Sequence, residues 1–233
     1  MANYVQVGQS RTSVTANTQR AIVKVDVRPF YVLMYGEPGI RKNAGKVFQW
    51  AAETKARELE EQENAETLVT PVTNFEEFKA AIEGAAPETP PLLARVVSGV
   101  YFFGHASSQA IFVGENAWAG TNVDLSNVFG LTPGNMRKNA NVWLYCCNAG
   151  NTASGMPCIA ELMADIIRRD VYAFSSGMHY QNSPELRGLA LAMPLKDRKP
   201  MYLVPDNGKP ATLFPKPDIN ESKEEKYIGP EQP

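Results

Sequence analysis

Between Phe30 and Phe174 the chain alternates short apolar runs of strand length with stretches whose apolar side chains repeat at helical spacing. Strands that alternate with helices in this way are typical of α/β domains, in which a mostly parallel sheet is covered by helices. The apolar runs predict strands at 30–35, 67–72, 96–103, 110–113, 141–145 and 171–174. Helix-forming stretches run from Ala44 to about Asn64, from an N-cap at Asn74, and from near Met156. The sequence therefore predicts a single α/β domain with a largely parallel central sheet.

The two ends of the chain have a different composition. Residues 1–20 are polar with weak alternation, and residues 205–233 contain repeated prolines and the charged stretch 221–226. Segments of this kind have little apolar surface to bury. We expect an N-terminal extension over 1–20, the α/β domain over 21–204 and a flexible C-terminal tail over 205–233.

Charge and cysteine content exclude several classes of function. The formal net charge of the 233 residues is -2 and basic residues do not cluster, which argues against a nucleic-acid partner. The sequence shows no signal peptide and no uninterrupted apolar span, so we expect no membrane association and either a cytoplasmic location or export without a cleaved signal. Three cysteines cannot form a complete disulfide framework, and the absence of Cys-x-x-Cys or His-x-x-x-His spacing predicts no metal site.

Two chemically capable side chains follow two of the predicted strands. His105 lies two residues past the end of the apolar run 96–103, and Cys147 lies two residues past the end of the run 141–145. The carboxyl ends of strands form the ligand crevice of open α/β sheets, so both side chains can face one substrate. A cysteine and a histidine are the minimum equipment for nucleophilic attack on an acyl carbon. A helix that begins near Met156 would favour the thiolate if its N-terminus lay close to the sulfur.

This pattern resembles a known family. An apolar block ending in His105, followed 42 positions later by an apolar block ending in Cys147-Asn-Ala-Gly150, resembles the caspase, legumain and gingipain superfamily of cysteine peptidases, especially its bacterial toxin-associated members. The resemblance covers roughly residues 96–180 and implies a caspase-like three-layer sandwich. It also implies that Cys147 is the nucleophile, that His105 is the general base, and that backbone N–H groups of Ala106 and Cys147 hold the oxyanion.

The sequence departs from the family at Ala106, where the family usually has glycine. Alanine does not easily adopt positive φ, so an altered oxyanion hole and an inactive relative are both compatible with the sequence. Ser175, Ser176 and His179 follow the last predicted strand and are candidate pocket residues. His179 is open to three interpretations: a rival base, a specificity residue, or a loop histidine.

The resemblance leads to a functional expectation. We expect a cysteine endopeptidase that hydrolyses a protein or peptide substrate through a thioester acyl-enzyme without a metal or organic cofactor, acting as a bacterial effector or processing protease. A cognate inhibitor or immunity protein is the further expected partner. The alternatives are a catalytically inactive caspase-like domain that binds a protein and a thiol amidase of another fold. Cys146 and Cys158 are interpreted as packing residues because cysteine is among the most buried residue types.

Overall fold

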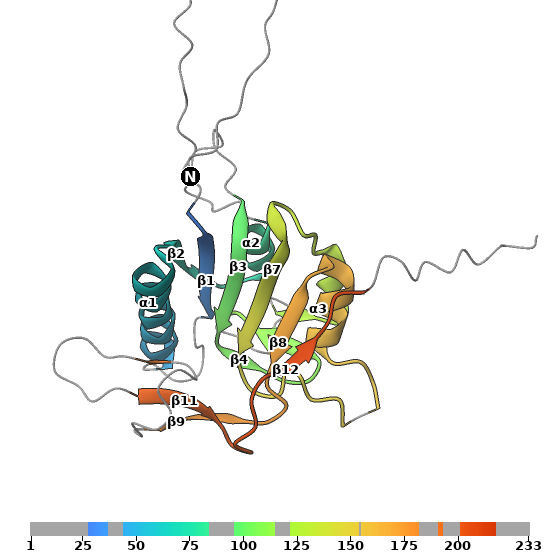
Figure 1. Cartoon of the computed structure of the whole chain (residues 1–233). Coiled ribbons are helices and arrows are strands. Elements are labelled where there is room, and N and C mark those ends of the chain that lie inside the picture. The colour runs from blue at the N-terminus through green and yellow to red at the C-terminus, as the bar shows by residue number, and fades with distance from the viewer. Residues whose placement is uncertain are drawn as a thin grey trace, which may run out of the picture.

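A six-stranded mixed sheet forms the centre of the computed structural model, which describes residues 28–36, 44–83, 96–114, 122–153, 155–181, 191–192 and 201–217. The strand order is β12-β8-β7-β3-β1-β2 (Figure 1). Every neighbouring pair is parallel except β12 and β8, which are antiparallel. The predicted α/β class with a mostly parallel sheet is confirmed. The strands are β1 (Phe30–Gly36), β2 (Glu66–Val72), β3 (Val97–Phe103), β7 (Met136–Tyr145), β8 (Asp170–Ala173) and β12 (Thr212–Phe214).

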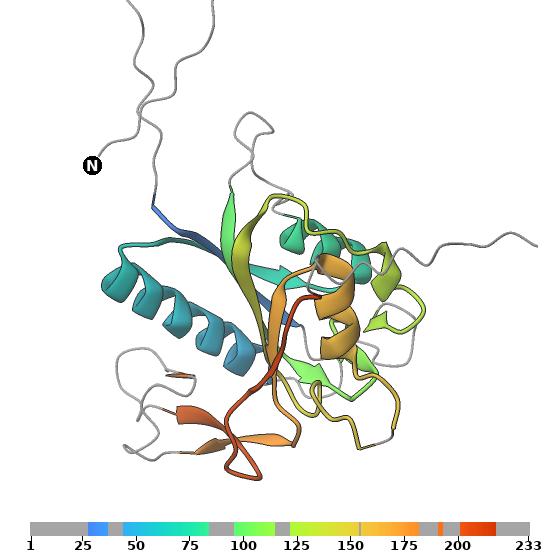
Figure 2. The ribbon, with the colours of Figure 1, turned by 45° about the vertical axis from the view of Figure 1, so that its right-hand side comes forward.

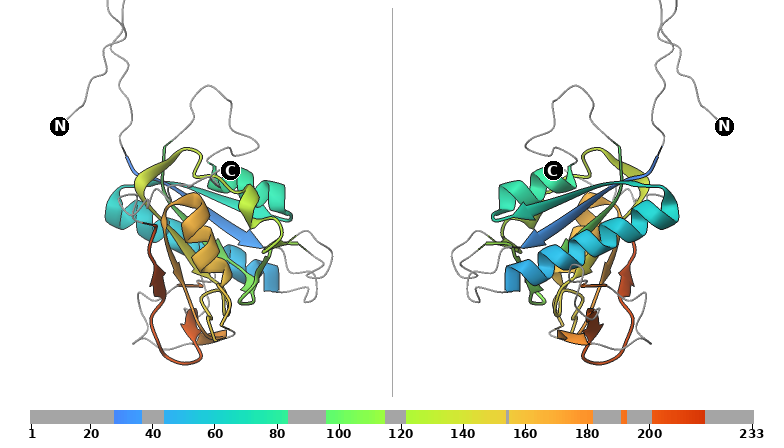
Figure 3. Two further views of the ribbon diagram at one scale, coloured as in Figure 1. Left: turned by 90° about the vertical axis from the view of Figure 1, so that its right-hand side faces the viewer. Right: turned by 90° about the vertical axis from the view of Figure 1, so that its left-hand side faces the viewer.

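Helices cover both faces of this sheet. Helix α1 (Ala44–Glu63) lies on one face, and α2 (Phe75–Ile82) and α3 (Ile159–Ile167) lie on the other (Figures 2 and 3). Strand side chains alternate between the faces, so the apolar interior divides into a cluster shared with α1 and a larger cluster shared with α2 and α3. In the part of the chain that the structure describes, no helix combines the length and apolar character needed to cross a bilayer.

Local sequence signals explain where the elements begin. The Asn74 side chain accepts a hydrogen bond of 2.9 Å from the Glu77 N–H, and the Glu77 carboxylate in turn accepts one of 2.8 Å from the Thr73 N–H. These bonds satisfy N–H groups at and just before the start of α2 that have no partner within the helix. In β3 nearly all side chains are buried, as expected of a strand covered on both faces.

Two small antiparallel sheets lie outside the central one. The first has the order β4-β5-β6, and its strands are β4 (His105–Ala106), β5 (Ala110–Phe112) and β6 (Val123–Asp124). The second has the order β10-β11-β9, and its strands are β9 (Met178–Gln181), β10 (Leu191–Ala192) and β11 (Met201–Pro205). Strands β9 and β11 lie beyond the carboxyl ends of the central strands (Figure 1). A 3₁₀ turn, η1 (Val128–Gly130), follows β6.

The C-terminal segment differs from its prediction. The sequence predicts a flexible tail from residue 205, but β12 pairs with β8 and buries Phe214, leaving that residue 9% exposed. The Lys216 N–H also donates a hydrogen bond of 3.0 Å to the Asp170 carboxylate. The packed region therefore continues to residue 217. The predicted extension 1–20 and the charged stretch 221–226 lie outside the described residues.

Candidate active site

His105 and Cys147 follow two neighbouring parallel strands at the same level. Phe103 of β3 pairs in register with Tyr145 of β7, and the Gly104 N–H continues the ladder with a hydrogen bond of 3.4 Å to the Tyr145 carbonyl. His105 and Cys147 each lie two residues beyond that pair. Both residues therefore lie just past neighbouring strand ends at the carboxyl edge of the sheet, where β3 leads into β4 and β7 leads into a turn.

The two side chains also lie on the same side of the sheet. The Phe103 and Tyr145 rings stack at 5.0 Å on the face that α1 covers. The His105 ring meets Phe48 of α1 edge-on at 4.9 Å. The Cys147 sulfur accepts a hydrogen bond from the backbone N–H of Met178, whose side chain packs against the same α1-side cluster. Both His105 and Cys147 thus have neighbours that pack on the α1 side.

Backbone hydrogen bonds fix the position of the Cys147 sulfur. The Met178 N–H donates to Sγ at 3.2 Å. Cys147 opens a turn that continues to Gly150, and Asn148 within it has a φ of 58°, in the left-handed region where asparagine is tolerated better than most residues. The Asn148 N–H donates to the Ser176 carbonyl at 2.9 Å, and the Gly150 N–H donates to the Phe174 carbonyl at 3.0 Å. The segment after β7 is thus bonded to the segment after β8.

The backbone at Ala106 presents an N–H at the edge of the small β4-β5-β6 sheet. The Ser107 N–H donates to the Ala110 carbonyl at 2.8 Å, which makes this a hydrogen-bonded pair. The next pair, Ala106 with Ile111, is then a non-hydrogen-bonded pair, so the Ala106 N–H points away from β5. Ala106 lies in strand β4 and is absent from the non-glycine residues with positive φ, so alanine fits here without backbone strain.

The other two cysteines are placed for packing. Cys146 is 1% exposed and faces the α2–α3 side, and burial together with the neighbouring Cys147 raises its pKa well above the ordinary thiol value. Cys158 is the N-cap of α3 and is also 1% exposed, and burial raises its pKa. Both therefore stay neutral thiols near neutral pH, whereas Cys147 is only half-buried.

The N-terminus of helix α3 is hydrogen-bonded to the turn that begins at Cys147. The helix begins at Ile159, three residues after Met156. Its first N–H groups are already occupied, because Ile159 donates to the Ser108 carbonyl at 2.7 Å and Ala160 donates to the Ala149 carbonyl at 3.2 Å. These bonds join the β4–β5 hairpin and the Cys147 turn to α3, so the helix supports the site as scaffold.

His179 lies on strand β9, next to Met178. Its side chain contacts a residue that the sequence analysis did not indicate. Its Nδ1 lies 2.5 Å from Asp206 Oδ1, and both side chains are about half exposed. The Asp206 N–H donates to the Gly177 carbonyl at 2.8 Å, and the Asn207 side chain reaches Ser175 Oγ at 3.4 Å. The turn after β11 is therefore hydrogen-bonded to the segment 175–179. This segment includes Ser176 and the Met178 N–H beside Cys147.

Sequence reasoning missed Met178 and Asp206. Met178 acts through its backbone, which carries no side-chain signal, and Asp206 falls in the segment interpreted as a flexible tail. In the described ranges, no three side chains of the metal-binding types gather into a candidate metal site. A comparison with known protein families finds no family model that matches the chain. A comparison with curated proteins finds none with significant similarity.

Proposed function

We propose that this protein is a cysteine endopeptidase in which Cys147 is the nucleophile and His105 the general base. The observation that supports the proposal is that the two residues follow the in-register ends of the neighbouring strands β3 and β7, at Phe103 and Tyr145. The resemblance to the caspase, legumain and gingipain superfamily supports the same pair, and a mostly parallel sheet with helices on both faces agrees with a caspase-like three-layer sandwich.

The proposed reaction uses only groups of this chain and water. His105 takes the thiol proton as Cys147 Sγ bonds to the carbonyl carbon of the scissile peptide. The N–H groups of Ala106 and Cys147 stabilise the resulting oxyanion. Collapse of the tetrahedral intermediate breaks the C–N bond, and His105 returns the proton to the leaving amine. Water, deprotonated by His105, then attacks the thioester carbonyl carbon. Collapse of this second tetrahedral intermediate breaks the C–S bond and releases the acid, and His105 returns the proton to the Cys147 sulfur.

The candidate pocket residues lie on the side of Cys147 formed by the segment after β8. Ser175 and Ser176 are half-buried there, and His179 follows the Met178 N–H that bonds to the sulfur. We assign these side chains to the wall of the substrate cleft. The proposed role is that of a bacterial effector or processing protease, whose partners are a protein or peptide substrate and a cognate inhibitor or immunity protein.

A thiol-directed acyl electrophile followed by a peptide-library assay tests the proposal. We expect covalent labelling at Cys147, identified by mass spectrometry of the digested protein, and cleavage of internal peptide bonds. The Cys147→Ala variant is the matched control for both readouts. Labelling without cleavage of peptides, but with turnover of small amides, would favour a thiol amidase. Absence of both labelling and turnover would favour an inactive domain that binds proteins.

A further inference from the structure

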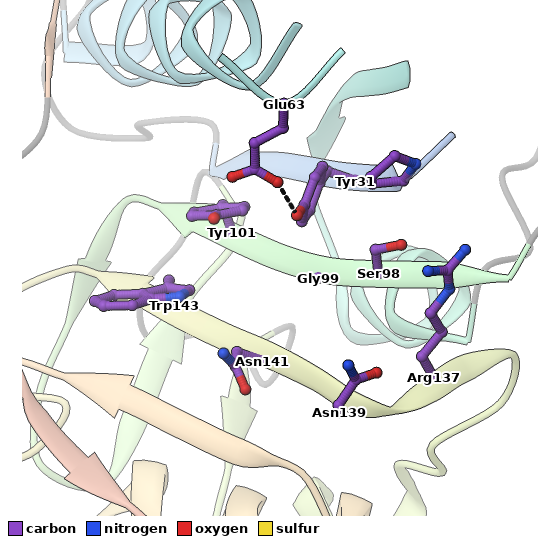
Figure 4. A pocket seen from close by; sticks show the side chains of 10 residues that line it. Tyr31, Glu63, Ser98, Gly99, Tyr101, Arg137, Asn139, Asn141 and Trp143 are labelled. Atoms are coloured by element: carbon purple, nitrogen blue, oxygen red, sulfur yellow. Dashed lines mark hydrogen bonds between the residues drawn. The ribbon is translucent and has the colours of Figure 1, made fainter. Parts of the chain in front are cut away.

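A cavity lies on the α1 side of the sheet. It has a volume of about 290 Å³ and is lined by residues at the C-terminal end of α1 and along β1, β3 and β7, as far as Tyr101 and Trp143 (Figure 4). Its lining is predominantly polar, although β3 and β7 are central strands of the sheet. Arg137 and Asn139 fall between Met136 and Asn141, where the register of β7 with β3 shifts, and their exposed side chains are accessible to a ligand.

Glu63 gives the cavity a negative group on one side. Glu63 is the last residue of α1, and its carboxylate accepts a hydrogen bond of 2.5 Å from the Tyr31 hydroxyl. Burial and the hydrogen bond to Glu63 raise the pKa of Tyr31 to about 12, so this hydroxyl remains a donor at neutral pH. One donor leaves the carboxylate with unused acceptor sites, since an ionised carboxylate has about four. Glu63 can therefore accept further hydrogen bonds from a cation.

Arg137 gives the cavity a positive group on the other side. Residues 137, 139, 141 and 143 alternate along β7, and their side chains, Arg, Asn, Asn and Trp, all line the cavity (Figure 4). Arg137 and Asn139 are exposed, and within the described ranges the guanidinium has no ion-pair or hydrogen-bond partner. An unpaired guanidinium offers a fork of donors that matches a carboxylate.

Gly99 leaves the space between these two groups open. A Cβ at this position would lie 3.0 Å from the Tyr31 ring and 3.3 Å from the Asn141 carbonyl oxygen, so any side chain would enter the cavity floor or press on its walls. The Tyr101 ring, with the Lys55 ammonium 5.7 Å from its centre, closes the side next to Glu63. The site is thus a polar recess with a carboxylate and a guanidinium on different sides.

We propose that this cavity binds a small zwitterion, a free α-amino acid or a dipeptide, whose ammonium group contacts Glu63 and whose carboxylate contacts Arg137. The cavity volume is at the small end of the roughly 300–1,000 Å³ range of ligand pockets, which suits a ligand of this size. The inference does not depend on the peptidase proposal, because Cys147 follows the end of β7 and is not among the residues that line the cavity. A Cys147→Ala variant is therefore expected to bind the zwitterion as the unmodified protein does.

Isothermal titration with the common L-α-amino acids and a set of dipeptides identifies the best probe. The same probe is then titrated as its N-acetyl derivative, which lacks the cation, and as its methyl ester, which lacks the anion. We expect each blocked form to bind at least tenfold more weakly. Equal binding of either blocked form would overturn the proposal, as would absence of binding by every probe.

Variants with matched controls locate the binding to this cavity. Arg137→Gln and Glu63→Gln are each expected to weaken the best probe by at least tenfold. Lys138→Gln, on the same strand but the other face, and Glu61→Gln, on the same helix but outside the cavity, remove the same charges and are expected to leave binding unchanged. Gly99→Ala is expected to weaken binding by filling the floor. Thermal melts confirm that each variant is folded, and equal losses in the control variants would overturn the assignment.

Discussion

At the scale of single residues, adjacent cysteines on one strand end have opposite surroundings. Cys146 is buried among the α2–α3 side chains, whereas Cys147 is half-buried beside the Met178 N–H. We predict that Cys147→Ala abolishes labelling and turnover without unfolding the protein. Cys146→Ala should keep activity and lower the free energy of unfolding by about 1–2 kcal/mol, because it leaves a small cavity. Urea denaturation and peptide turnover measure the two effects, and an inactive Cys146→Ala with an active Cys147→Ala would contradict the assignment.

The two histidines make a second prediction at this scale. His105 follows β3, the strand next to β7 that precedes Cys147, whereas the side chain of His179 on β9 contacts Asp206. General-base assistance is typically worth about 10²–10⁴-fold, so we predict that His105→Ala lowers kcat/KM by at least the lower figure. His179→Ala should change mainly KM. The pH profile of kcat/KM should lose an ionisation in the imidazole range only in the His105 variant. Loss of both rate and ionisation in His179→Ala would assign the base to the His179–Asp206 pair.

At the scale of elements, the short strand β12 makes a testable contribution to the sheet. Phe214 is buried in the α2–α3 cluster, and a Cβ on Gly150 would lie 3.0 Å from its ring. Its neighbour Leu213 is on the opposite face and is 45% exposed. We predict that Phe214→Ala lowers the free energy of unfolding by about 3 kcal/mol, whereas Leu213→Ala changes it by less than about 0.5 kcal/mol. Equal effects in urea denaturation would mean that β12 does not pack as described.

The elements that the sequence predicts well are those with a strong local period. Helix α1 and strands β1, β2 and β3 follow their predicted ranges to within a residue or so, because 3.6-residue or apolar periodicity is visible over the whole element. Strand β12 was missed because three residues between prolines carry no period, and its partner β8 lies about 40 residues earlier in the chain. Pairing over such a separation is decided by the tertiary structure.

At the scale of the whole molecule, one sheet face carries both candidate sites. The sequence predicted Cys147 and His105 because apolar runs end at each of them, and strand alternation separates Cys147 from Cys146. The contact between Asp206 and His179 could not be predicted, because it depends on the antiparallel pairing of β11 with β9. The cavity did leave a signal, because arginine and asparagine at positions 137, 139 and 141 indicate that the first part of β7 is not covered on both faces.

The same face gives the whole molecule a characteristic response to alkaline pH. The pKa of Tyr31 is raised to about 12, and burial raises the pKa of Tyr101 and Tyr145 further. An unfolded tyrosine ionises near pH 10, so above that pH the unfolded chain binds fewer protons than the folded one. The stability that these three hydroxyl groups contribute should therefore be constant below about pH 10. The free energy of unfolding should fall as the pH rises from there toward 12 and beyond. The Tyr145→Phe substitution keeps the aromatic ring and removes one of the three hydroxyl groups that titrate.

Urea denaturation at a series of pH values measures this slope. We predict that the decline above pH 10 is shallower in Tyr145→Phe than in the unmodified chain, by the equivalent of about one proton where the unfolded tyrosine is ionised. The buried Cys146 thiol, whose pKa is also raised, adds a decline that begins at a lower pH and is common to both proteins. The chain has nine tyrosines, so the tyrosinate absorbance of Tyr145 is obtained as the difference between the two proteins, and this difference should appear together with unfolding. If the difference appears while the protein is still folded, or if both proteins show the same slope, the Tyr145 hydroxyl is more accessible to water than the structure describes.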